Sequence, residues 1–96
     1  MSIVLGDRYT VDLFKLMGFN GRAFTDAKEL YEYILKNINI YNIFFISSNF
    51  ARQLRKELDE LRLRNTNKIF VEIPSVLENM EREVNYLQLV RQILGG

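Results

Sequence analysis

Polar side chains that could do chemistry occur in three short segments, each directly after an apolar run. These segments are Gly6-Asp7-Arg8, Ser47-Ser48-Asn49 and Pro74-Ser75. Parallel strands direct their carboxyl ends to one edge of a sheet, where the connecting loops separate and ligands bind. We therefore expect conformational loops at this edge, formed by Gly6, Asp7, Ser47, Pro74 and Ser75.

Each segment has a functional and a structural interpretation. Asp7 could hold a cation or another ligand, or it could accept hydrogen bonds from backbone N–H groups in its own loop. Ser47 and Ser48 could receive an anion at a helix N-terminus or cap that helix. A phosphate-accepting receiver is excluded, because Ser47 stands where its acceptor Asp would be and Pro74 stands where a Lys would follow the strand.

The composition removes most other catalytic chemistry. The chain of 96 residues has no His and no Cys, so disulfides, the usual zinc sites, iron–sulfur clusters and His-based acid–base catalysis are excluded. It has neither the GxGxxG pattern of dinucleotide sites nor the GxxxxGK[ST] pattern of phosphate loops. We expect no catalytic residue, no metal site and no cofactor.

Length and charge limit the class of protein further. Ninety-six residues make one domain with one modest core, and the net charge of +1 gives no general reason to expect nucleic acid or an anionic membrane as partner. The first residues lack the pattern of a signal peptide, and no apolar run approaches the ~18 residues of a membrane span. A soluble, intracellular protein is expected.

Four apolar runs alternate with helical patterns, which predicts an α/β fold with a small four-stranded parallel sheet flanked by helices. The expected strands are residues 2–6, 22–25, 42–47 and 68–73. The third has four apolar residues in succession, as a strand covered on both faces requires, so it should lie at the centre of the sheet. Pro74 should end the fourth strand.

Helices are predicted between these strands. Residues 10–17 should form a short helix ended by Gly18, and Asp26 with Glu29 has the spacing of a capping box for a helix over residues 26–38. A further helix capped by Ser48 or Asn49 should run on to about residue 64. Its basic segment, residues 52–64, is open to two interpretations: a solvated face, or a contact with an acidic partner or nucleic acid.

The last predicted helix, about residues 83–94, differs from the others. Its apolar residues spread over about 220° of the helix circumference, whereas a stripe of about 100° is enough to lie on one core. A domain of this size has little material to cover the excess, so contact with a partner is favoured over burial within the domain. We expect an α/β domain over residues 1–76 and a C-terminal loop and partner-binding helix over residues 77–96.

Several segments together resemble a known family. They are GDRYTV (residues 6–11), FKLMGF (14–19), an apolar strand ending at Ser47, EIPS (72–75) and LQLVRQILGG (87–96). Their order and spacing resemble the F subunit of the V-type and A-type rotary ATPases. The flavodoxin- and receiver-like arrangement of strands, with an extra C-terminal helix, agrees with that resemblance.

The resemblance implies a subunit of the central rotor stalk without an active site of its own. Such a subunit would bind the coiled coil of the D subunit through its last helix, with the d (or C) subunit and the A/B catalytic ring as possible further partners. It would be cytoplasmic, peripheral to the membrane through the complex, and would help to couple ATP hydrolysis or synthesis to H⁺ or Na⁺ transport. The expected partner-binding residues are Val84, Leu87, Val90, Arg91 and Leu94.

Two other functions remain open from the residues alone. The chain could be a free-standing, receiver-like ligand-binding module that self-associates through its last helix. It could also bind nucleic acid through residues 52–64, although no aromatic platform accompanies these charges.

Overall fold

The protein forms a parallel sheet with helices on both faces. The computed structural model describes residues 1–79 and 86–95. Its strands are β1 (Ser2–Gly6), β2 (Gly21–Ala23), β3 (Ile43–Ser47) and β4 (Ile69–Ile73). Its helices are α1 (Arg8–Leu16), α2 (Ala27–Lys36), α3 (Ser48–Gln53), α4 (Arg55–Arg64), α5 (Val76–Asn79) and α6 (Tyr86–Leu94).

The strand order is β2-β1-β3-β4, with every neighbouring pair parallel. This is the flavodoxin-like order, in which the chain moves from one side of β1 to the other. The prediction of a four-stranded parallel α/β fold with an extra C-terminal helix is confirmed. Strand β3 is one of the two inner strands, and β4 ends at the residue before Pro74, as expected.

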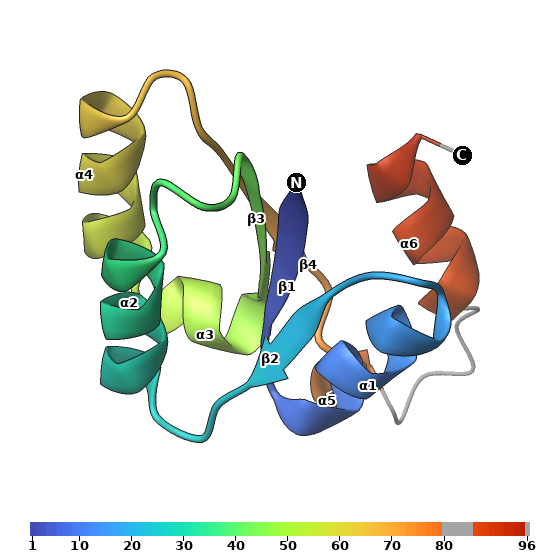
Figure 1. Cartoon of the computed structure of the whole chain (residues 1–96). Helices are drawn as coiled ribbons and strands as arrows, with labels where there is room; N and C mark the ends of the chain where they lie inside the picture. The colour runs from blue at the N-terminus through green and yellow to red at the C-terminus, as the bar shows by residue number, and fades with distance from the viewer. Residues whose placement is uncertain (80–85, 96) are drawn as a thin grey trace.

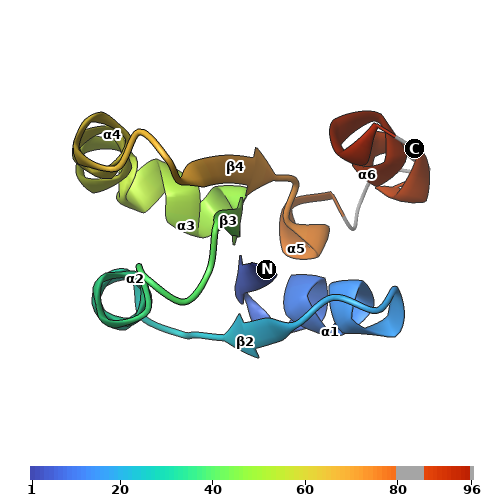
Figure 2. The same ribbon diagram turned by 45° about the horizontal axis from the view of Figure 1, so that its top comes forward.

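The two faces of the sheet carry separate cores (Figures 1 and 2). Helices α2, α3 and α4 cover one face, where Phe44 stacks on Phe70 with ring centroids 5.3 Å apart. Helices α1 and α6 cover the other face, where Val90 of α6 is buried in a smaller cluster with Phe14 and Phe45. The last helix therefore lies back on the sheet and completes its second face.

Helix α1 begins two residues earlier than predicted. Asp7 is its N-cap and accepts a hydrogen bond from the backbone N–H of Thr10, which fixes the start of the helix at Arg8. Its end is as expected, because Gly18 follows the C-cap with a φ of 95°, in the left-handed region where a side chain is strained. Strand β2 lies at residues 21–23 and not 22–25, because its pairing follows the register of Val4 with Gly21.

Helix α2 is shorter than predicted, but Asp26 caps it as expected by accepting from the backbone N–H of Lys28 at 3.2 Å. The prediction of one helix from Ser48 to about residue 64 is wrong, because the chain leaves the helical conformation at Leu54. Hydrogen bonds of Ser48 to Ser75 and Glu78 hold α3 near the ends of the strands, while Leu58 and Leu61 pack α4 against the sheet. The bend at Leu54 satisfies both sets of contacts.

Candidate functional site

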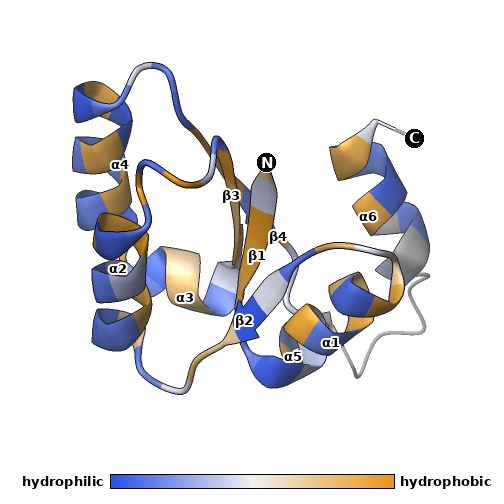
Figure 3. Cartoon of the chain, viewed as in Figure 1, coloured by the Kyte–Doolittle hydropathy of each residue, from blue (hydrophilic) through white to orange (hydrophobic). Residues whose placement is uncertain are grey.

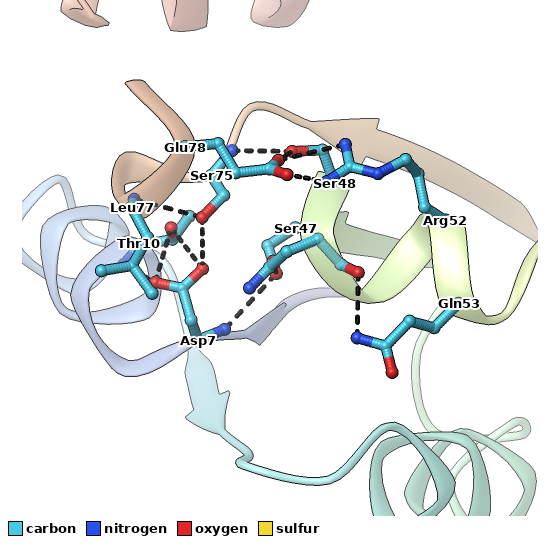
Figure 4. A network of polar contacts seen from close by, with 10 residues as sticks. Asp7, Thr10, Ser47, Ser48, Arg52, Gln53, Ser75, Leu77 and Glu78 are labelled. Carbon is cyan, nitrogen blue, oxygen red and sulfur yellow. Dashed lines mark hydrogen bonds and ion pairs between the residues drawn. The ribbon is translucent and has the colours of Figure 1, made fainter. Parts of the chain in front are cut away.

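The three polar loops predicted at the sheet edge meet there in one hydrogen-bonded network (Figure 4). Asp7 follows β1, Ser47 ends β3, and Ser75 follows β4. The side chains of all three are buried. The structure places these three residues together at this edge, where their hydrogen bonds connect the loops.

Asp7 is the centre of the network. One carboxylate oxygen accepts from the backbone N–H of Thr10 at 3.0 Å, and the other accepts from the Ser75 hydroxyl at 2.7 Å. The Thr10 hydroxyl also donates to this carboxylate at 2.9 Å, and in turn accepts from the backbone N–H of Val76 at 2.9 Å. These bonds join the start of α1 to the start of α5, across a separation of more than 60 residues in the chain.

Ser48 forms the second half of the network. Its hydroxyl accepts from the backbone N–H of Ser75 at 3.0 Å and donates to Glu78, which also pairs with Arg52. The hydroxyl of Ser47 donates to the Asn49 amide oxygen at 2.6 Å and accepts from the backbone N–H of Asp7 at 3.4 Å. Neither serine caps α3: Ser47 holds the N-cap position without a side-chain capping bond, so the predicted Ser48 or Asn49 cap is wrong.

Gly6 makes the close approach of β1 and β3 possible. A Cβ atom added to Gly6 would lie 2.5 Å from the Cβ of Ser47 and closer still to its hydroxyl oxygen. No side chain fits in that space without moving the strand ends apart. The role of Gly6 is therefore to leave room for the side chain of Ser47.

Tyr86 connects the last helix to the same edge. Its hydroxyl donates to the backbone carbonyl of Pro74, and its ring packs against the cluster on the α1 side of the sheet. Burial of the phenol and the nearby Asp7 carboxylate raise the pKa of Tyr86 to about 12, although a hydrogen bond with Thr10 acts in the opposite direction. The neutral phenol is thus the form that holds α6 in place.

A hollow of about 580 Å³ opens beside the network, outside the ends of β1, β2 and β3. Arg8 and Arg22 line it, and so do the acidic residues Asp7 and Glu29. These opposite charges balance, and the Asp7 carboxylate is already occupied by its own hydrogen bonds. The lining therefore does not select an anion or a cation.

The buried polar side chains of the described residues are bonded within the protein. Within residues 1–79 and 86–95, no group of three or more carboxylates, His or Cys could hold a metal ion. In the same part of the chain, every buried side-chain nitrogen or oxygen has a hydrogen-bond partner. Asp7 accepts bonds in its own loop, which agrees with the structural interpretation of this residue.

A comparison with known sequence families identifies the family of this chain. The profile of the ATP synthase (F/14-kDa) subunit family matches residues 3–90. The chain belongs to this family. It is a subunit of the V/A-type ATP synthase, as the sequence resemblance predicted. A search of curated proteins finds no significant match. No helix in the described part of this ATP synthase subunit is long and apolar enough to cross a membrane.

The predicted partner-binding residues of this subunit lie in different environments. Val90 is buried against the sheet, Leu94 is partly buried in the same cluster, and Arg91 is exposed. Leu87 lies in the first turn of α6, and Val84 falls outside the described residues. The structure thus places α6 on the body with one side in the core and another in solvent.

Sequence reasoning missed four members of the network: Thr10, Arg52, Glu78 and Tyr86. Thr10 had a local signal, because it follows Asp7 by three residues, the spacing of an N-cap and its N3 position. Glu78 and Tyr86 had no local sequence signal. Residues 75–83, which contain Glu78 and precede Tyr86, have no clear periodicity. Only the folded chain brings them to the ends of the strands.

Proposed function

We propose that this chain is a non-catalytic subunit of the central rotor stalk that binds the D subunit through α6. With D and the d (or C) subunit, it would couple ATP hydrolysis or synthesis in the A/B ring to H⁺ or Na⁺ transport by the membrane ring. It would act on the cytoplasmic side, attached to the membrane only through the complex. Residues 1–76 would form the body, and residues 77–96 the part that the partner binds.

The observation that carries this proposal is the division of α6 into two sides. Val90 is only 2% exposed, whereas Ile93 is 40% exposed and the Arg91 side chain lies in solvent. A helix that needed only its own domain would turn its large apolar residues inward. Ile93 and Arg91 are two residues apart, so they lie on opposite flanks of the buried Val90, and together they suit a partner that offers apolar and acidic side chains.

The bonding of Asp7 within its own loop supports the non-catalytic role. The Asp7 carboxylate, the polar group nearest the usual ligand site of this fold, accepts from Thr10 and Ser75 and is buried. A general base must be within reach of a substrate proton, and this carboxylate faces its own loop. ATP chemistry would then belong to other subunits of the complex.

Binding to purified D subunit tests the role of α6. The full chain should form a 1:1 complex in calorimetry, and removal of residues 84–96 should weaken it strongly. Because that truncation also removes Val90 from the core, a second variant with Arg91→Gln and Ile93→Ser changes only the exposed side. We expect this double variant to raise the Kd for D at least tenfold.

A matched control is available on the other face of the sheet. Leu35 of α2 is 45% exposed, close to the 40% of Ile93, so Leu35→Ser removes a similar apolar surface away from α6. This variant should bind D like the wild type. Unchanged affinity in both the truncated and the doubly substituted chain would contradict the role of α6, and a tight homodimer of the isolated chain in light scattering would favour the self-associating module instead.

A further inference from the structure

The end of the molecule opposite the polar network has an unusual surface. Large apolar side chains are exposed there: Ile40 at 56%, Leu63 at 81% and Ile69 at 55%. The cations Lys36, Arg64 and Lys68 come from the same segments, at the ends of α2 and α4 and before β4. We call these six residues the basic end.

Three segments distant in sequence are joined at this end through Asn42. Its backbone N–H donates to the carbonyl of Met1 at 2.8 Å, and its own carbonyl accepts from Ile69 at 2.9 Å. Its side-chain oxygen accepts from the Lys68 ammonium at 3.3 Å. Figure 1 shows the start of β1, the loop before β3 and the loop before β4 at one end of the fold. These bonds bring the three segments together at this end of the fold.

The charge of this surface is one-sided. Residues 36–42 and 62–71 contain four Lys or Arg side chains and no Asp or Glu. Since the whole chain has a net charge of +1, the remainder carries a net charge of −3. One of the four, Arg62, pairs with Asp59 at 3.1 Å and donates to the Phe70 carbonyl at 2.9 Å. Of the three cations of the basic end, Lys68 is half-buried and donates to Asn42, while Lys36 and Arg64 are exposed.

Apolar side chains alternate with these cations. Leu63 precedes Arg64, and Ile69 follows Lys68, so two of the three exposed apolar residues lie next to a cation in the chain, while Ile40 lies four residues after Lys36. Figure 3 shows the same mixture as orange and blue segments at the upper end of α4 and in the loop before β3. A surface of this kind suits a partner that offers both carboxylates and apolar side chains.

We propose that the basic end is a docking surface for an acidic protein segment with apolar side chains, presented by another subunit of the complex. It lies apart from the exposed side of α6 and would act independently of the D contact proposed above. A protein is favoured over nucleic acid because the surface is apolar between its cations and has no aromatic platform: Tyr41, which follows Ile40, packs edge-on against Phe44 at 5.9 Å.

Photocrosslinking in the assembled complex tests the contact directly. The photoreactive amino acid p-benzoylphenylalanine is placed at position 69, the complex is irradiated, and the crosslinked peptide is sequenced by mass spectrometry. We expect a peptide from another subunit with a clear excess of Asp and Glu. Position 16, where Leu16 is 85% exposed at the end of α1, serves as the control and should not label this peptide.

Charge variants then test whether the cations hold the partner. A triple variant with Lys36→Gln, Arg64→Gln and Lys68→Gln should lower the crosslinking yield at position 69 at least tenfold. Its matched control removes three exposed cations from the first turns of the same two helices, with Lys28→Gln, Arg55→Gln and Lys56→Gln. The control should leave the yield unchanged, and raising the salt from 50 to 500 mM should lower the wild-type yield.

Several outcomes would overturn the proposal. They are no crosslink at position 69, a crosslink to a second copy of this chain, or one to a segment without acidic excess. Binding of the wild-type chain to vesicles of anionic lipid, lost in the triple variant and without any protein crosslink, would assign the surface to a membrane instead. Because α6 is intact in every variant, D binding measured in parallel separates a failure here from a failure of the proposed function.

Discussion

The two ends of the parallel sheet are built in opposite ways. At the carboxyl ends of the strands, Asp7, Ser47 and Ser75 are buried and bonded to one another's loops. At the amino ends, Leu63 and Ile69 are exposed among cations. Folds of this topology bind ligands at the carboxyl ends, where their loops separate. In this chain the buried polar side chains at that end are bonded to one another's loops, and the surfaces proposed above for partners lie elsewhere.

The difference has a physical consequence for stability. A buried polar network is strong only if every member is satisfied, because an unpaired group in a low dielectric is expensive. Substitutions at the carboxyl ends should therefore be severe, and those at the basic end mild. Three substitutions and one pH titration test this contrast, with expected effects that decrease from the first to the last.

Gly6→Ala should have the largest effect. The added methyl group would overlap the side chain of Ser47, and forcing β1 and β3 apart should lower the free energy of unfolding by about 3 kcal/mol. Urea denaturation measures this loss. Ser47→Gly removes both clashing atoms, so the double variant should be more stable than Gly6→Ala alone. Failure of this rescue would mean that contact with Ser47 is not the reason for a glycine at position 6.

Asp7→Asn should come next, with a loss of about 2 kcal/mol. The carboxylate accepts from Thr10 and Ser75, and an amide would turn its NH₂ group toward one of these donors. Asp12→Asn is the control on the same helix, because Asp12 lies on the surface and forms only an exposed pair with Arg8 at 3.7 Å. Equal losses in the two variants would show that the network adds no stability.

Tyr86 gives the third test, through pH. The folded chain holds the pKa of this phenol at about 12, above its ordinary value of 10.0, so folding favours the neutral form. This stabilisation is fully present below pH 10 and is lost as the pH rises to about 12. After allowance for solvent around the ring, it amounts to about 1 kcal/mol.

The measurement compares wild type with Tyr86→Phe in urea at pH 8, 10 and 11.5. Phenylalanine keeps the ring but cannot ionise, so the difference between the two proteins should shrink and then reverse as the pH rises. Effects of pH that the two proteins share cancel in this difference. A difference that stays constant over this range would contradict the placement of the phenol against Pro74.

The contrast between the two ends also shows what the sequence could predict. Apolar runs such as residues 43–46 identified the parallel sheet, because a strand covered on both faces leaves a continuous signal. The same logic placed Asp7, Ser47 and Ser75 at one edge. Gly18 indicated the end of α1, because glycine adopts the left-handed conformation found there without steric strain.

What the sequence could not predict depends on contacts between distant segments. The bend at Leu54 follows from bonds between α3 and α5, and Glu78 and Arg52 have no local pattern that would pair them. The capping expected of Ser48 was wrong because its hydroxyl bonds to Ser75 instead. Likewise, the wide apolar circumference of the last helix did not indicate that Val90 would lie against its own sheet.

The smallest effect is expected at the basic end, where α4 offers a comparison within one helix. Leu61 is buried in the larger core and Leu63, two residues later, is 81% exposed. Leu63→Gln should change the free energy of unfolding by no more than about 0.5 kcal/mol, whereas Leu61→Gln should lower it by more than about 3 kcal/mol. Urea denaturation of the two variants measures both changes in the free energy of unfolding. If Leu63→Gln were as damaging as Leu61→Gln, Leu63 would be part of the core, the basic end would not be an open surface, and the contrast between the two ends of the sheet would fail.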